Sequence, residues 1–312
     1  MSKESADIVE AILSLKPQGG IFKDYVFPVS VSLFSALMGG SIALMINAKQ
    51  EVRKANQKKL QDTNELLFNV TKALNSLVTA KSNYYPVKYS TPSVRALRFP
   101  EILSKIQEIN DDVSYCSYVR DIPTCNLTRT ERLSRFYKRL RKIPLNRPSQ
   151  EALGKSWRNL NRVSAMLGNY NLIIELINKR NKIDEAVREK LAPVIESKEI
   201  STEAQFDDAI HSCLSKKQYL NWIDLTEMLI TTVDHTICEM DNFLKDFPDI
   251  AESNIDLLSI MSKSRLIRVN NDRPAYIELM KPVLTVDFVA LGADFSVDPE
   301  QLKQRYTLNA WY

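Results

Sequence analysis

The stretch from Tyr25 to Ala48 reads YVFPVSVSLFSALMGGSIALMINA and contains no charged side chain. An α-helix rises about 1.5 Å per residue and the hydrocarbon of a bilayer is about 30 Å thick, so roughly 20 apolar residues suffice to cross it. A buried core helix and the apolar region of a secretory signal are the alternatives for such a run. The length and the absence of charge favour a transmembrane helix over residues 25–48.

The residues on either side of this run predict its orientation. Residues 1–24 carry three lysines against four acidic residues, unlike the basic start of a signal peptide. Five basic side chains follow the run, opposed only by Glu51 and Asp62; they are Lys49, Arg53, Lys54, Lys58 and Lys59. Positive charge marks the cytoplasmic flank of a membrane helix. We therefore expect an uncleaved single span, a short N-terminal tail across the membrane, and residues 49–312 in the cytoplasm.

Cysteine usage agrees with that compartment. The four cysteines, Cys116, Cys125, Cys213 and Cys238, form no CxxC pair and no dense framework. This pattern is expected for reduced thiols in a cytosolic domain.

Scarce glycine after the apolar run favours long helices over a β-rich or nucleotide-binding fold, which needs glycine at tight turns and phosphate loops. After residue 48 the chain has Gly154, Gly168 and Gly292 and no others. We expect a mostly α protein, with a single N-terminal transmembrane helix, a cytoplasmic helical bundle and a small extended or α+β C-terminal segment. The expected division is a tail (1–24), a transmembrane helix (25–48), a long membrane-proximal helix (49–85), a helical bundle domain (86–265) and a C-terminal extended segment packing on the bundle (266–312).

An apolar stripe follows the predicted span and is expected to continue its helix. Its members recur in alternating steps of three and four: Leu60, Thr63, Leu67, Val70, Leu74 and Leu77. This spacing is typical of a coiled coil or of a bundle helix. Leu66 and Ala73 widen the stripe, so packing inside a bundle is at least as well supported as a two-stranded coil.

Capping patterns and apolar periodicity predict the later helices. Thr128 and Glu131 have the spacing of a capping box, and Ser149 is expected to start a longer helix that continues toward Leu191. Further helices are expected after Pro100, after Ser201 or Thr202, over residues 219–246 and 255–261, and after Asp298. Residues 283–289 are enriched in β-branched and aromatic side chains, which predicts a strand or an extended segment.

Small residues line one face of the predicted span. Ser35, Gly39 and Ala43 are four residues apart, and Gly40 lies on the adjacent stripe. Small side chains at this spacing let two membrane helices approach closely, although they are also common in membrane helices generally. We predict self-association into a homo-oligomer through Ser35, Gly39, Gly40 and Ala43.

Charge is segregated in the part after the span. Residues 129–162 carry eleven basic and two acidic side chains, whereas residues 183–261 carry seventeen acidic and six basic ones. Arg132, Arg135, Arg139 and Lys142 share one helix face, opposite an apolar face. Such a basic surface suits anionic lipid or nucleic acid. The plainer interpretation, which we favour slightly, is that it is solvated or packs on the acidic helices of the same chain.

The sequence predicts no catalytic, cofactor-binding or metal-ligating residue. Phosphate-loop, nucleophile-elbow and dinucleotide-binding motifs are absent from the sequence. Asp207 or Asp208 with His211, and His235 with Glu239, place a carboxylate one helical turn from an imidazole, as bundle metal sites do. A solvated acidic face explains these pairs better, because acidic residues are frequent throughout this region.

The function expected from these features is interaction: anchoring, sensing or assembly at a membrane with a protein partner that the sequence does not name. A membrane-perturbing or pore-forming effector controlled by the cytoplasmic domain is the alternative. A third class is an unrecognised hydrolase or nuclease in the helical domain, which the motif searches disfavour.

Overall fold

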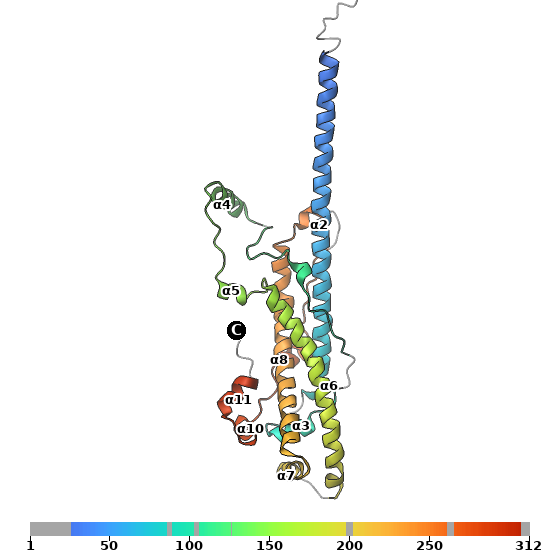
Figure 1. Cartoon of the computed structure of the whole chain (residues 1–312), viewed down its shortest axis with the longest axis vertical. Coiled ribbons are helices and arrows are strands. Elements are labelled where there is room, and N and C mark those ends of the chain that lie inside the picture. Colours follow the sequence, from blue (N-terminus) through green and yellow to red (C-terminus); the bar gives the residue numbers. More distant parts are fainter. Residues whose placement is uncertain are drawn as a thin grey trace, which may run out of the picture. The chain divides into compact units, whose positions relative to one another are not determined.

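The protein was analysed as a computed structural model, which describes residues 26–85, 89–102, 106–125, 127–197, 202–260 and 265–306. These residues are mostly helical and contain no strand. The chain divides into two compact units, residues 1–55 and 56–312. The longer elements are α2 (Phe27–Tyr84), α4 (Arg129–Leu140), α6 (Leu160–Ser197), α7 (Glu203–Cys213) and α8 (Lys216–Glu252). The shorter ones are α3 (Pro92–Arg98), η2 (Ser114–Cys116), α5 (Gln150–Gly154), η3 (Leu257–Ser259), α9 (Pro274–Met280), α10 (Phe288–Phe295) and α11 (Pro299–Tyr306) (Figure 1).

Helix α2 runs without a break through the predicted span and the predicted membrane-proximal helix. In the first unit none of the described residues, 26–55, is buried. In the second unit the predicted apolar stripe of α2 is buried throughout, including Leu66 and Ala73; its other members are Leu60, Thr63, Leu67, Val70, Leu74 and Leu77. The stripe therefore packs inside a bundle formed by this chain.

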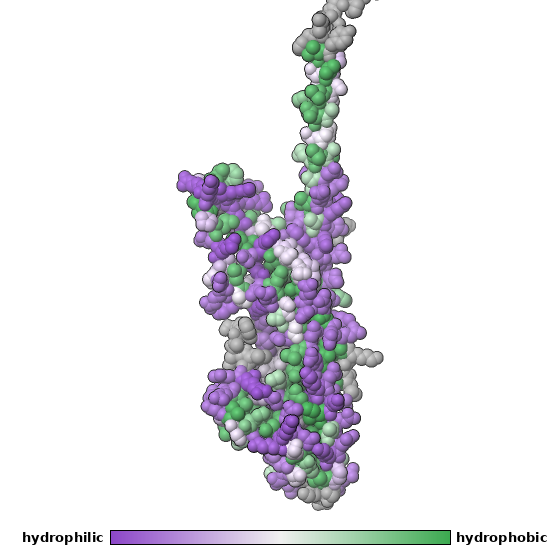
Figure 2. Space-filling model, in the orientation of Figure 1, coloured by the Kyte–Doolittle hydropathy of each residue, from purple (hydrophilic) through white to green (hydrophobic). Residues whose placement is uncertain are grey.

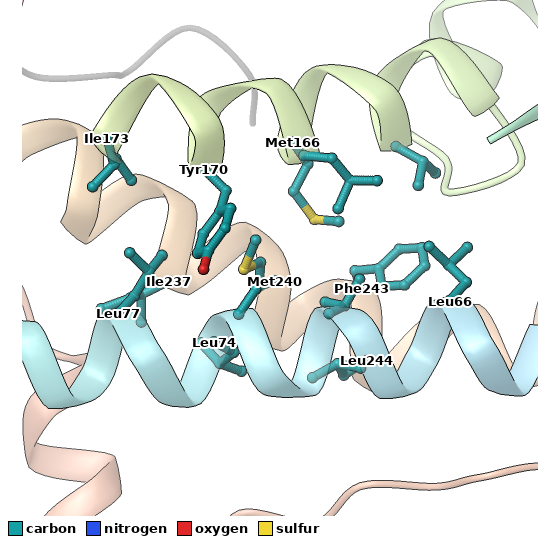
Figure 3. Close-up of a cluster of buried hydrophobic side chains, with 14 of the residues drawn as sticks. Leu66, Leu74, Leu77, Met166, Tyr170, Ile173, Ile237, Met240, Phe243 and Leu244 are labelled. Carbon is teal, nitrogen blue, oxygen red and sulfur yellow. The ribbon is translucent and has the colours of Figure 1, made fainter. Parts of the chain in front are cut away.

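The main core lies between α2, α6 and α8. Figure 3 shows apolar side chains from all three helices pointing toward one another, among them Leu74 of α2, Tyr170 of α6 and Met240 of α8. Phe243 of α8 is stacked on Phe247 with 4.5 Å between ring centroids, and Trp157 meets the edge of Phe243 at 5.2 Å. A single apolar stripe on each of three long helices thus removes one continuous surface from water, which is the main stabilising contribution.

A second core forms where α3, α7, α10 and α11 gather around the C-terminal half of α6 and the N-terminal part of α8. Its centre is Trp222, which is fully buried and donates its indole N–H to Asp184 at 3.1 Å. The corner between α10 and α11 is tight, since a side chain on Gly292 would lie 2.9 Å from the Val297 carbonyl oxygen. Glycine is required there because a methyl group does not fit against backbone at that distance.

The C-terminal segment differs from the predicted strand. Its described residues, 265–306, form the short helices α9, α10 and α11, and residues 282–287 have no regular secondary structure. The backbone groups that a strand would offer to a neighbouring strand have other partners. The Val283 N–H donates to Asp234 at 2.8 Å, and the Asp287 N–H donates to the Ser90 carbonyl at 2.9 Å. The α+β alternative for this segment is therefore not observed in the described residues.

The helix predicted after Pro100 is wrong for the described residues 101–102 and 106–113, which are irregular. Asparagine side chains on α6 hold this segment extended. Asn171 accepts from the Ile109 N–H at 3.0 Å and donates to the Ile109 carbonyl at 2.8 Å. Asn181 donates to the Ile102 carbonyl at 3.1 Å. A helix would need these backbone groups for its own ladder, so the side chains of α6 compete successfully with it.

The helix predicted from Ser149 is also shorter than expected. Ser149 caps α5, which ends at Gly154, and α6 begins only at Leu160. Between them, Ser156 and Asn159 each accept the backbone N–H two residues further on, at 3.2 and 3.1 Å. Such local side-chain turns interrupt helices. By contrast, the capping box predicted at Thr128 is formed at the start of α4, and the helix predicted after Ser201 or Thr202 is α7, capped by Thr202; both predictions are confirmed.

Candidate functional site

The apolar part of α2 is the first exposed surface of interest. Among the described residues, α2 is the one helix long and apolar enough to cross a membrane, and none of that apolar window is buried. Its large side chains are open to solvent, with Phe34 66% exposed, Leu37 62% and Leu44 72%. An apolar helix of a water-soluble core would be covered, whereas none of the described residues covers this one. Tyr25 and the predicted tail 1–24 lie outside the described residues.

The predicted self-association residues lie on this exposed part of α2. Ser35, Gly39, Gly40 and Ala43 are all exposed. A methyl group placed on Gly39 or Gly40 meets no atom of the described chain within 4 Å. Among the described residues this face is therefore uncovered, and a larger side chain there clashes with none of them.

Helix α4 is the second exposed surface. Thr128 and Glu131 cap its start: the Thr128 N–H donates to Glu131 at 2.8 Å, and the Glu131 N–H donates to the Thr128 hydroxyl at 3.3 Å. No residue of α4 is buried. Its apolar face is formed by Leu133 (69% exposed), Phe136 (63%), Tyr137 (50%) and Leu140 (68%). Apolar residues appear on both α4 and the N-terminal part of α2 in Figure 2.

The predicted basic residues lie along the same helix. Arg132, Arg139 and Lys142 are exposed, whereas Arg135 is half-buried and donates to the Pro123 carbonyl at 2.6 Å. Among the described residues, none of these four cations is in an ion pair with a carboxylate. Among the described residues α4 thus makes no ion pair with the acidic region, and none of its residues is buried against that region.

The acidic region uses its carboxylates elsewhere. Four acidic residues of α8 reach four different elements, each with a donor and acceptor atom less than 3 Å apart. Asp224 pairs with Arg305 of α11 at 2.7 Å, and Glu227 with Arg95 of α3 at 2.8 Å. Asp234 pairs with Lys81 of α2 at 2.6 Å, and Glu239 with Arg162 of α6 at 2.8 Å. Helix α8 therefore forms ion pairs with four other helices of the second unit. Among these four cationic partners, only Arg162 comes from the basic 129–162 region.

Burial raises the pKa of two of these carboxylates. Burial raises the pKa of Glu227 to about 7, although the neighbouring Arg95 opposes the shift. Burial likewise raises the pKa of Asp234, opposed chiefly by Lys81. Desolvation of a carboxylate disfavours its charged form, and the partner cation offsets part of that cost. These pairs position the helices; sequence reasoning missed them because net charge does not reveal which carboxylates lie within an apolar stripe.

A cleft of about 860 Å³ opens between α5, α6, α8 and α11, within the size range of small-molecule sites. Its polar groups include Arg162, His235 and Glu239. Burial lowers the pKa of His235, and Glu239 opposes this shift. The two threonine hydroxyls of the lining donate to backbone carbonyls, Thr231 to Tyr306 at 2.9 Å and Thr232 to Met228 at 2.7 Å. The cleft thus places no free hydroxyl nucleophile beside a base among these residues.

In both histidine–carboxylate pairs considered as metal ligands, at least one side chain contacts another residue. His211 lies 3.8 Å from Asp207, and its ring packs against Tyr219 at 4.3 Å between centroids. Asp207 also accepts a hydrogen bond from Ser93. Glu239, one turn from His235, is the ion-pair partner of Arg162. The described residues contain no group of three or more acidic, histidine or cysteine side chains arranged to hold a metal, and Asp208 joins no such group.

The structure therefore presents two exposed amphipathic or apolar surfaces, on α2 and α4, and a cleft whose charged groups are paired. Comparison with known protein families, with curated proteins and with solved structures finds no match to this chain.

Proposed function

We propose that this chain is a single-pass membrane protein whose helical domain lies in the cytoplasm and acts through protein contacts, anchoring or assembling a partner at the membrane. The protein self-associates through the small-residue face of its span. The observation that carries the proposal is the apolar part of α2: it is long enough to cross a bilayer and no described residue covers it. A bilayer supplies the apolar surroundings that such a surface needs.

The flanking charge supports the orientation. Lys49, Arg53 and Lys54 follow the apolar run directly and are not buried. Basic residues next to a span tend to remain on the cytoplasmic side, which supports a cytoplasmic position for the helical unit.

The contacts in the cleft support interaction over catalysis. Arg162 is bonded to Glu239, stacked 3.9 Å from the Trp157 ring centroid and donates to the Lys155 carbonyl. Arg305, also in the lining, is paired with Asp224. Side chains whose charges are satisfied by one another hold helices in place and leave little capacity to stabilise a reacting group.

The test is membrane integration of the full chain with a topology reporter fused after Tyr312. Alkaline carbonate should leave the protein in the membrane, and the reporter should be active on the cytoplasmic side. Leu37→Arg together with Leu44→Arg should release the protein, because each charge at the centre of a span costs about 2.5–3.5 kcal/mol on insertion scales.

The matched control is Phe68→Arg, which changes an equally exposed residue of α2 beyond the apolar run. It should leave membrane integration unchanged. Extraction of the unmodified protein by carbonate, or a reporter signal from the other side of the membrane, would contradict the proposal.

A further inference from the structure

Helix α4 has an apolar face that no other part of the described fold covers. It has twelve residues and none is buried. Helices of this length are marginal in water by themselves and gain most of their stability by packing an amphipathic face against something. The capping box at Thr128 and Glu131 contributes about 1 kcal/mol, and the cation of Arg141 lies 4.3 Å from the Tyr137 ring centroid. These local contacts leave the apolar face of Leu133, Phe136 and Leu140 without a partner among the described residues.

The residues around that face specify the chemistry of the missing partner. On a helical projection Arg132 and Arg139 border the apolar side chains on one edge and Arg141 borders them on the other. Long basic side chains at the borders of an apolar face can reach headgroup phosphates while the face enters the acyl boundary. Nucleic acid would use the cations but would have no need for four large apolar side chains between them. The combination matches an anionic bilayer surface best.

The attachment of α4 to the bundle supports the same partner. The loop before α4 is pinned to the end of α8, because the backbone N–H groups of Thr124 and Cys125 donate to the Ser253 carbonyl at 2.9 and 2.8 Å. Arg135 then ties α4 to this loop through the Pro123 carbonyl.

Asn56 of α2 lies at that same end of the second unit. Its side chain donates to the Ser259 hydroxyl at 2.9 Å, six residues after the residue that pins the α4 loop. Asn56 is eight residues beyond Ala48, the end of the uncharged run. The helix α4 is thus attached to the end of the bundle from which the chain continues into the apolar run.

We propose that α4 is a second membrane contact, lying in the interface of the anionic cytoplasmic leaflet with Leu133, Phe136, Tyr137 and Leu140 facing the acyl chains. Arg132, Arg139 and Arg141 bind the lipid phosphates. The inference rests on the proposed single span, which holds α4 near the bilayer. Contact at two points, the span and α4, restrains the helical domain against the membrane.

The experiment compares amide hydrogen exchange of the full chain in nanodiscs of neutral phosphatidylcholine and in nanodiscs containing phosphatidylserine. The amides of α4 should exchange at least about tenfold more slowly in the anionic discs, since docking protects an otherwise marginal helix. Added salt should reverse the protection by screening the phosphates. The triple variant Arg132→Glu, Arg139→Glu, Arg141→Glu should lose it, because each cation near an anionic surface contributes about fivefold in affinity and three together about a hundredfold.

The matched control is Lys182→Glu, Lys216→Glu, Lys217→Glu, which makes the same change in net charge at exposed positions outside α4. It should keep the protection of α4. Equal exchange of α4 in the two lipids, or protection by an added oligonucleotide in neutral discs without protection by anionic lipid, would overturn the proposal.

The same data separate this inference from the proposed function. Amides of residues 27–48 should be protected in both lipids if they span the bilayer, whatever α4 does. A protected span with unprotected α4 would overturn the second contact alone. Unprotected residues 27–48 would overturn the single span, and the second contact with it.

Discussion

At the scale of single residues, the second unit contains cationic side chains that are fully buried. The side chain of Lys81 is fully buried in the last turn of α2, where it meets Asp234 of α8 and the Lys281 carbonyl, each at 2.6 Å. Arg95 is similarly buried against Glu227 and donates to the Leu284 carbonyl. Each cation therefore ties a helix both to α8 and to the irregular segment 281–284. A buried ion pair adds little net stability over an apolar pair, but removing one partner leaves an uncompensated charge.

We predict that Asp234→Ala lowers the free energy of unfolding by about 3–5 kcal/mol, because Lys81 would remain buried without its counter-ion. Asp234→Asn retains an acceptor for the Val283 N–H and should recover part of this loss. Urea denaturation followed by circular dichroism measures both. The control is Glu175→Ala, which breaks the exposed pair with Lys179 and should change stability by less than about 1 kcal/mol. Equal effects at the buried and exposed pairs would contradict this account.

A second prediction at this scale concerns His235. Burial lowers its pKa below the ordinary value of about 6.5, so the folded protein favours the neutral imidazole more than the unfolded chain does. The unfolded chain therefore takes up the proton first, and this group's contribution to stability is lost as pH falls below about 6.5. Histidine-selective NMR titration should give a pKa below 6.5, with His211→Gln to assign the remaining signal. A value above 6.5 would show that Glu239 outweighs burial.

At the scale of elements, one helix serves two environments. The part of α2 before residue 56 buries nothing, whereas the part after it buries an apolar stripe of the bundle. The change follows directly from the side chains, because an uncharged run gives way to a stripe flanked by charge. Among the described residues no atom lies within 4 Å of a methyl group placed on Gly39 or Gly40, so neither glycine is required by a contact there.

We predict that Gly39→Ile weakens the oligomer by at least about tenfold in detergent, because added methylene groups separate two backbones that would otherwise touch. Cross-linking and analytical ultracentrifugation measure the effect. The control Ser41→Ile makes a similar change of size on the opposite face of α2 and should leave the oligomer intact. A monomeric unmodified protein, or loss of the oligomer in both variants alike, would show that the small-residue face plays no specific part.

At the scale of the whole molecule, the second unit contains every buried residue that the structure describes. Its two hydrophobic cores share Met228 at their margins, which joins them along α8. The described residues of the first unit, 26–55, include the exposed apolar run, and none of them is buried. The buried residues and the proposed membrane span thus lie in different stretches of the sequence.

We predict that a fragment of residues 56–312 folds cooperatively and unfolds within about 3 °C of the full chain in detergent, a difference below about 1 kcal/mol at this size. Thermal circular dichroism measures this. A fragment of residues 68–312 is the control: it lacks Leu60, Leu66 and Leu67 of the main core and should be strongly destabilised. Failure of the longer fragment to fold would show that residues before 56 contribute to the core.

Much of the architecture is determined by local sequence. The uncharged run, the stripe from Leu60 to Leu77 and the capping boxes at Thr128 and Thr202 each correspond to a helical feature of the structure. These signals are local because helix periodicity and capping involve residues within one or two turns.

Only the tertiary structure decided which segments stay irregular and which charges meet. Asn171 and Asn181 hold the segment after Pro100 away from a helix, and Asp234 and Arg95 do the same for the predicted strand at residues 283–289. Each of these side chains is more than forty residues away in sequence from the backbone group it binds, so no local sequence pattern predicts the contact. A buried backbone group takes whichever partner the folded chain brings to it. The partners of the α8 carboxylates follow from the same physics, because pairing depends on the packing of distant helices.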